Sequence, residues 1–191
     1  MRNIILGLAP VFAMRFYQAL DLPPRLALDP EDLQRRFYGK SRQWHPDRFS
    51  RAPAAQQQES LEMTAVINDA FRTLRDPVQR AEYFLGEHGL GPTKHAPAEL
   101  LEEVFEMNMA LEELRSGDES ARPPLEAARG RFQHLLAEID HGLYDMSIRY
   151  DEAPDESLLH AIRSGLDRRR YVSNLIRDVD KELESNVHLS N

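Results

Sequence analysis

The chain contains no cysteine among its 191 residues. This absence excludes disulfide bonds, thiolate nucleophiles and cysteine-ligated zinc or iron–sulfur centres within the chain. No apolar run reaches the roughly 18–20 residues that a membrane-spanning helix needs. Basic residues are outnumbered by acidic ones, with 24 lysine and arginine residues against 32 aspartate and glutamate residues. The resulting net charge of −8 argues against a nucleic-acid-binding protein, since phosphates attract a basic surface.

The first thirteen residues are distinct from the rest. The segment from Ile4 to Ala13 is apolar and follows a single arginine, as in a signal peptide, but Pro10 interrupts it and no small-residue cleavage site follows. We therefore expect residues 1–13 to be a loosely attached arm or an over-extended start before Met14, and the protein to be cytoplasmic.

Strand patterns of alternating apolar residues are lacking as well, and helical spacings of three and four take their place. The front half predicts four helices, over about residues 15–20, 30–45, 54–75 and 78–88. The second begins at Asp29-Pro30, an N-cap residue followed by proline at the first helical position, and ends before Pro46. Its expected inward stripe is Leu33, Phe37, Ser41 and Trp44. That of the third helix is Leu61, Thr64, Ile67, Asn68, Phe71 and Leu74.

Three longer amphipathic helices follow, over about residues 98–115, 124–150 and 155–183, joined by short polar loops. Such a series predicts an antiparallel three-helix bundle. The fold class is therefore all-α, with a helical hairpin and short flanking helices in front and the bundle behind.

Charge and turn residues divide the chain near residue 80. Residues 14–80 carry a net charge of +2, and residues 81–191 carry −11. Three glycines and two prolines between residues 86 and 97 predict a helix end and a loop. We therefore expect a first domain over 14–80, a connecting helix end and linker over 81–97, and the bundle over 98–186. The contrast in charge indicates two modules with different partners.

The tripeptide His45-Pro46-Asp47 lies at the end of a basic helix. Proline biases the preceding residue toward extended backbone, so His45 and Asp47 should be presented at a solvent-facing, flat or convex turn. Taken alone, the tripeptide fits a capping turn, a His–Asp acid–base pair or a weak metal site. No nucleophile elbow or glycine-rich phosphate loop accompanies it. The basic face beside it fits an acidic protein partner and consists of Arg35, Arg36, Lys40 and Arg42.

The helix predicted over 98–115 has two apolar stripes. At 100° per residue, one contains Leu100, Val104, Met107, Leu111 and Leu114 and suffices to face a bundle core. The other contains Leu101, Phe105 and Met109, with Glu102, Glu106 and Glu113 beside it. This second stripe is either buried against neighbouring elements or an exposed protein-binding ridge with an acidic border. On the last helix, the run Arg168-Arg169-Arg170 is by default a solvated face.

Several separated motifs resemble a J-domain: residues 16–23, the basic helix, His45-Pro46-Asp47-Arg48-Phe49, and residues 67–77. The segment 80–89 and the acidic bundle behind it resemble more narrowly the HscB-type co-chaperones of iron–sulfur cluster assembly. General J-proteins often carry a glycine/phenylalanine-rich region and cysteine-rich zinc repeats instead, and this chain has neither.

The resemblance implies two sets of docking residues. A DnaK-class, HscA-like chaperone would contact His45, Pro46, Asp47, Arg35, Arg36, Lys40 and Arg42. An IscU-like iron–sulfur scaffold protein would contact Leu101, Phe105, Glu106, Met109, Glu113, Arg170 and Tyr171. Met109 stands where the family more often has an acidic residue, and Glu102 where it often has an apolar one, so the patch is open to a shift of one helical turn.

The expected function is that of a co-chaperone, which is not an enzyme and uses no cofactor or metal. It stimulates the ATPase of the DnaK-class chaperone and delivers the scaffold protein to it for cluster transfer. The alternative is a J-domain protein that recruits such a chaperone to an unrelated client. No nucleic acid or membrane partner is expected.

Overall fold

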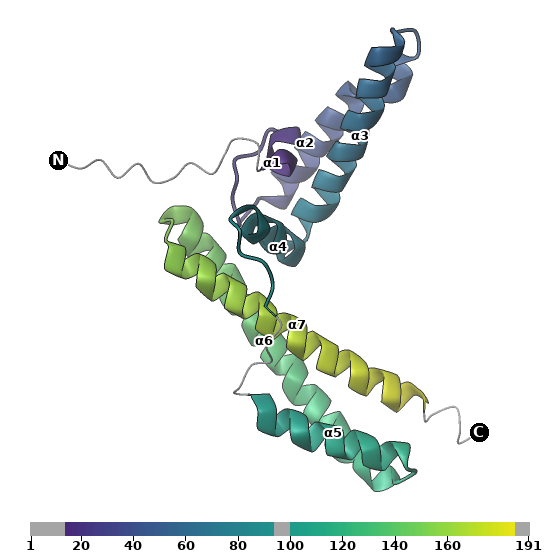
Figure 1. The fold of residues 1–191 in the computed structure, drawn as a ribbon, viewed down its shortest axis with the longest axis vertical. Coiled ribbons are helices and arrows are strands. Elements are labelled where there is room, and N and C mark those ends of the chain that lie inside the picture. Colours follow the sequence, from purple (N-terminus) through teal and green to yellow (C-terminus); the bar gives the residue numbers. More distant parts are fainter. Residues whose placement is uncertain (1–13, 94–99, 186–191) are drawn as a thin grey trace, which may run out of the picture. The chain divides into compact units, whose positions relative to one another are not determined.

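The computed structural model describes residues 14–93 and 100–185, and within these ranges it contains helices and connecting segments but no strand (Figure 1). The all-α fold predicted from the sequence is confirmed. No helix in these ranges is both long and apolar enough to cross a membrane. The expected arm over 1–13 and the helix start expected at Ala98 lie outside the described residues.

The chain forms two compact units that interleave in sequence. The first consists of the residues up to Gly91 together with Ser147–His160, and the second of Pro92–Met146 together with the residues from Ala161 onward. The boundaries predicted at residues 80 and 97 follow the linear order of the chain and stay a prediction.

The first unit is built around a hairpin of two helices, α2 (Pro30–Gln43) and α3 (Ala54–Arg75), joined through the 3₁₀-helix η1 (Pro46–Phe49). Phe37 and Phe71 stack across the hairpin with ring centroids 4.1 Å apart. The short helices α1 (Arg15–Ala19) and α4 (Pro77–Glu87) pack against α3. Asp29 caps α2 with its carboxylate, as its place before proline predicted.

The inward face of α3 differs in part from the prediction. Ile67 and Leu74 are buried, whereas Leu61 and Asn68 are exposed, so these two expectations are wrong. The buried face contains Ser60 in place of Leu61, because the Ser60 hydroxyl donates a 2.7 Å hydrogen bond to the Trp44 carbonyl. Hydrophobicity alone cannot select a polar residue for the interior.

Side chains hold the backbone of the segment before α2. Asp151 accepts hydrogen bonds from the amides of Leu26 and Ala27, at 2.9 and 2.7 Å. The buried Arg80 guanidinium donates to the carbonyls of Leu26 and Leu74, each at 2.7 Å. These bonds satisfy polar groups that would otherwise destabilise the interior of the unit.

The second unit contains α5 (Leu101–Arg115), the 3₁₀-helix η3 (Glu119–Ala121), and most of α6 (Arg122–Glu152) and α7 (Glu156–Ser185). The three α-helices share one core, which confirms the predicted bundle. The first stripe predicted for α5 is buried in that core, as expected. At Gly165 a Cβ atom would lie 2.8 Å from Leu143 Cδ2, which shows how closely α6 and α7 pack there.

Candidate functional site

His45 and Asp47 lie at an exposed corner where the α2–α3 hairpin turns. Their side chains are 57% and 91% exposed. His45 has the extended backbone that a following proline favours, with φ −59° and ψ 128°, and Pro46 opens η1. The His45 Nδ1 atom accepts a 3.3 Å hydrogen bond from the Asp47 amide and lies 3.6 Å from the Asp47 carboxylate. The turn therefore presents an imidazole and a carboxylate together to solvent.

Contacts on both sides fix the backbone of this corner. The carbonyl of Trp44 accepts hydrogen bonds from the hydroxyls of Ser60 and Thr64 on α3, at 2.7 and 2.9 Å. The rings of Trp44 and Phe49 stack with their centroids 5.9 Å apart. Because the residues before and after the turn are anchored, His45 and Asp47 are held in position although their side chains are exposed.

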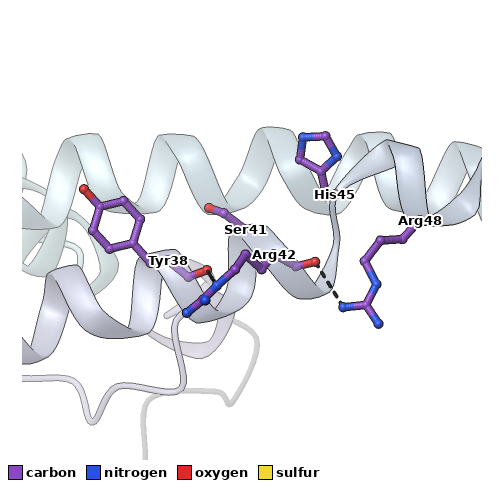
Figure 2. A pocket seen from close by; sticks show the side chains of 5 residues that line it. All are labelled: Tyr38, Ser41, Arg42, His45 and Arg48. Carbon is purple, nitrogen blue, oxygen red and sulfur yellow. Dashed lines mark hydrogen bonds between the residues drawn. The ribbon is translucent and has the colours of Figure 1, made fainter.

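A hollow of about 670 Å³ lies beside His45 (Figure 2). It is lined by Tyr38, Ser41, Arg42, His45 and Arg48. The corner faces solvent as expected, but the expectation of a flat or convex surface is wrong. The Ser41 hydroxyl oxygen is buried and has no hydrogen-bond partner among the described residues. Its described lining residues include two guanidinium groups and no carboxylate, so the hollow suits a negatively charged group of a partner.

The basic residues of α2 fall into two groups. Arg35 and Arg36 both pair with Asp32, and Lys40 pairs with Asp21 at 2.6 Å. Within the described part of the chain, Arg42 instead donates only to a backbone carbonyl of its own helix, that of Tyr38, and Arg48 donates to the carbonyl of Arg42 (Figure 2). The sequence patterns did not point to Arg48 as a docking residue, although it follows Asp47 directly. The two arginines that line the hollow thus carry charges that no carboxylate of the described residues balances.

The second apolar stripe of α5 is exposed. Leu101, Phe105 and Met109 are 56%, 65% and 51% exposed, although they are large apolar residues. Glu106 and Glu113, the acidic residues predicted beside the ridge as scaffold contacts, are also exposed. Of the two possibilities for this stripe, burial is therefore wrong, and an apolar ridge with an acidic border remains. Solvated apolar patches of this kind commonly mark protein contacts.

The arginine run of α7 is not simply a solvated face. Arg169 forms a two-bond ion pair with Asp140 on α6, at 2.5 and 3.2 Å. Arg170 donates to the buried carboxylate of Asp167 and to the carbonyl of Thr93. Tyr171 is half-buried and packs against the core of the bundle. Of the pair expected to contact the scaffold protein, only Arg170 is exposed.

The hairpin and its corner coincide with a known domain, since residues 15–83 match the family model of the DnaJ domain. The chain carries a J-domain. Its histidine–proline–aspartate turn and its basic helix lie within the matched residues. The segments that resemble a J-domain in sequence are therefore those that form the hairpin, the corner and the flanking helices.

Solved structures extend the likeness beyond the J-domain. The chaperone HscB from Vibrio cholerae is 23% identical, has a TM-score of 0.63, and is matched over 91% of this chain and 99% of its own. Human co-chaperone HscB is 21% identical, with a TM-score of 0.62 over 87% of this chain and 81% of that one. The chain therefore has the fold of HscB, with a J-domain and a helical bundle in one polypeptide.

The corner of the J-domain has neither the arrangement of a His–Asp acid–base pair nor that of a metal site within the described residues. An acid–base pair needs a pocket that contains both groups, whereas the Asp47 carboxylate is not part of the lining of the hollow. No cluster of three histidine or acidic residues within 14–93 and 100–185 could hold a metal ion. A contact surface for another protein fits the geometry better.

Proposed function

We propose that this protein is a co-chaperone that docks a DnaK-class chaperone of the HscA-like kind and stimulates its ATPase. The observation that carries the proposal is the anchored, exposed corner of His45 and Asp47 beside a cationic hollow, within a J-domain. In this account the corner performs no chemistry on nucleotide. By binding one conformation of the ATPase better than another, it shifts the chaperone toward the state that hydrolyses ATP.

The contacts at the hollow follow from its charges. Arg42 and Arg48 would pair with acidic side chains of the chaperone, and the Ser41 hydroxyl, which has no partner among the described residues, would donate a hydrogen bond to one of them. Arg35, Arg36 and Lys40 stay part of the proposed docking face. Their pairing with Asp32 and Asp21 makes them weaker contributors, since a partner must first compete with those carboxylates.

The bundle would bind the cargo, an IscU-like iron–sulfur scaffold protein. Leu101, Phe105 and Met109 would be buried by an apolar surface of the scaffold, while Glu106 and Glu113 would meet basic groups around it. Arg170 and Tyr171 of α7 belong to the same proposed contact. The HscB fold of the whole chain supports this assignment.

Carrying both contacts on one chain would couple them. A scaffold protein held by the bundle is present at a raised effective concentration near the chaperone that the J-domain recruits. The protein would thereby direct the HscA-like chaperone to one cargo, the iron–sulfur scaffold protein, without changing either partner covalently.

Replacement of His45 by glutamine tests the J-domain contact. His45→Gln should lower the stimulation of the chaperone ATPase by about tenfold or more, which corresponds to about 1.4 kcal/mol of lost contact. His134→Gln is the matched control, because His134 is another exposed histidine and lies on α6. Steady-state ATPase assays measure the effect, and circular dichroism verifies the fold. Full stimulation by His45→Gln would exclude the proposed role of the corner.

Removal of the α5 ridge tests the cargo contact. The double variant Leu101→Ala with Phe105→Ala should weaken binding to a purified IscU-like scaffold by about 2–4 kcal/mol, since exposed anchors of an interface lose their buried area. Leu61→Ala, which removes an exposed leucine of α3, should bind normally. Calorimetry measures both affinities. No binding by the wild-type chain, combined with normal ATPase stimulation, would favour the alternative of an unrelated client.

A further inference from the structure

Thr93 is held to α7 by all three of its polar groups. Its amide lies 3.3 and 3.2 Å from the two carboxylate oxygens of Asp167, and its hydroxyl donates to the same carboxylate at 2.8 Å. Its carbonyl accepts a 2.6 Å hydrogen bond from Arg170. Thr93 therefore bridges an acceptor and a donor that are three residues apart on one helix.

Asp167 is the centre of this arrangement. Its side chain is only 9% exposed, and it also accepts from the buried Arg163 and from Arg170, both at 2.9 Å. Burial opposes ionisation of this carboxyl, but the hydrogen bonds from Thr93 and the Arg163 guanidinium outweigh it and lower its pKa. The carboxylate is thus a buried anion satisfied from several sides, which is a rigid support rather than a solvated charge.

The support acts on a single nitrogen of Arg170. The guanidinium contacts of Arg170 with Asp167 and Thr93 are both made by Nη2. The Nε and Nη1 atoms make no hydrogen bond with other described residues, and the side chain is 43% exposed. A long arginine that is anchored at one nitrogen presents its remaining donors in a fixed direction, whereas a free arginine would first lose rotamer entropy on binding.

We propose that Thr93 and Asp167 are positioning residues that pre-organise Arg170 for contact with an acidic or carbonyl group of the cargo protein. This inference rests on the proposed function of the bundle, and in particular on Arg170 as one of its contacts. It assigns a role in binding to Thr93, which comes directly after the proline that opens the second unit.

The effect expected from pre-organisation is moderate and specific. Ordering one rotamer-rich side chain costs about 0.5–1.5 kcal/mol, so loss of the support should weaken scaffold binding by roughly two- to tenfold. Thr93→Val removes the hydroxyl donor with little change of shape. Thr93→Ser keeps the hydroxyl and should bind like the wild type. Asp167→Asn should weaken binding as well. Because Arg163 then loses its buried carboxylate partner, a melting curve of this variant checks that the fold is retained.

A double-mutant cycle with Arg170→Ala tests the inference on the full chain by calorimetry with purified scaffold. We expect Thr93→Val to weaken binding in the wild-type background and to have no further effect once Arg170 is alanine. Equal binding by Thr93→Val and wild type, or the same loss in both backgrounds, would overturn the positioning role while leaving the α5 contact intact. Unchanged binding by Arg170→Ala would overturn it too. A wild-type chain that binds no scaffold would refute the cargo contact itself and this inference with it.

Discussion

At the scale of single residues, the side chains best suited to bind an acidic partner are the basic ones that form no ion pair within the described residues. Arg42 and Arg48 border the hollow beside His45 and, among the described residues, donate only to backbone carbonyls. Arg36 and Lys40 are committed to Asp32 and Asp21. Exposed ion pairs contribute little by themselves, yet they reduce the field that a partner experiences at long range.

Charge reversal should distinguish the two groups of arginines. Arg48→Glu should lower the affinity for the DnaK-class chaperone by about tenfold at low salt, because one attraction becomes a repulsion in a partly enclosed site. Arg35→Glu, next to Asp32, should have a smaller effect. Affinity measured by fluorescence anisotropy over a salt series checks this. A larger loss for Arg35→Glu would mean that the outer face of α2, rather than the hollow, is the contact.

The sequence predicted which residue types would cluster at this site but not which charges would stay unbalanced. The partner of Lys40 is Asp21, in the turn after α1, where Asp21 has a φ of +52°. Only the folded chain brings these two residues together. The hollow likewise depends on how the side chains of α2 and η1 lie, and no local pattern encodes that.

At the scale of secondary-structure elements, periodicity was most informative where a helix has one clearly buried side. On α5 the first apolar stripe is buried and the second is exposed, which is the arrangement that their angular positions predict for a helix with an interface on one side. On α3 the same reasoning failed for Leu61 and Asn68, which are exposed, whereas Ser60 is buried and donates a hydrogen bond to the Trp44 carbonyl. A hydrogen bond between elements can therefore accommodate a buried polar residue at a position that apolar periodicity does not select.

The hydrogen bonds between Asp151 and the segment before α2 should contribute measurably to the free energy of unfolding. Asp151→Asn replaces the carboxylate whose two oxygens accept hydrogen bonds from the Leu26 and Ala27 amides. It should lower the free energy of unfolding by about 1–3 kcal/mol. Asp145→Asn on the same helix removes only an exposed pairing with His141 and should cost far less. Urea unfolding followed by circular dichroism compares them. Equal stability of the two variants would show that the Asp151 contacts are not needed to hold the segment.

At the scale of the whole molecule, the division of charge fits the proposed division of labour. Residues 14–80 are mildly basic and contain the corner with its cationic hollow, while the strongly acidic remainder contains the apolar ridge. A contact steered by charge weakens with added salt, whereas burial of an apolar ridge depends less on it. In the proposed function, one chain would thus bind its two partners by different physical means.

Steady-state ATP hydrolysis by the DnaK-class chaperone tests the central claim most directly. The rate is measured for the chaperone alone, with the scaffold protein, with this chain, and with both. We predict that the chain stimulates hydrolysis by itself and that chain and scaffold together stimulate it by more than the sum of their separate effects, because one molecule presents both contacts. A rate that this chain leaves unchanged, with and without the scaffold, would contradict the account.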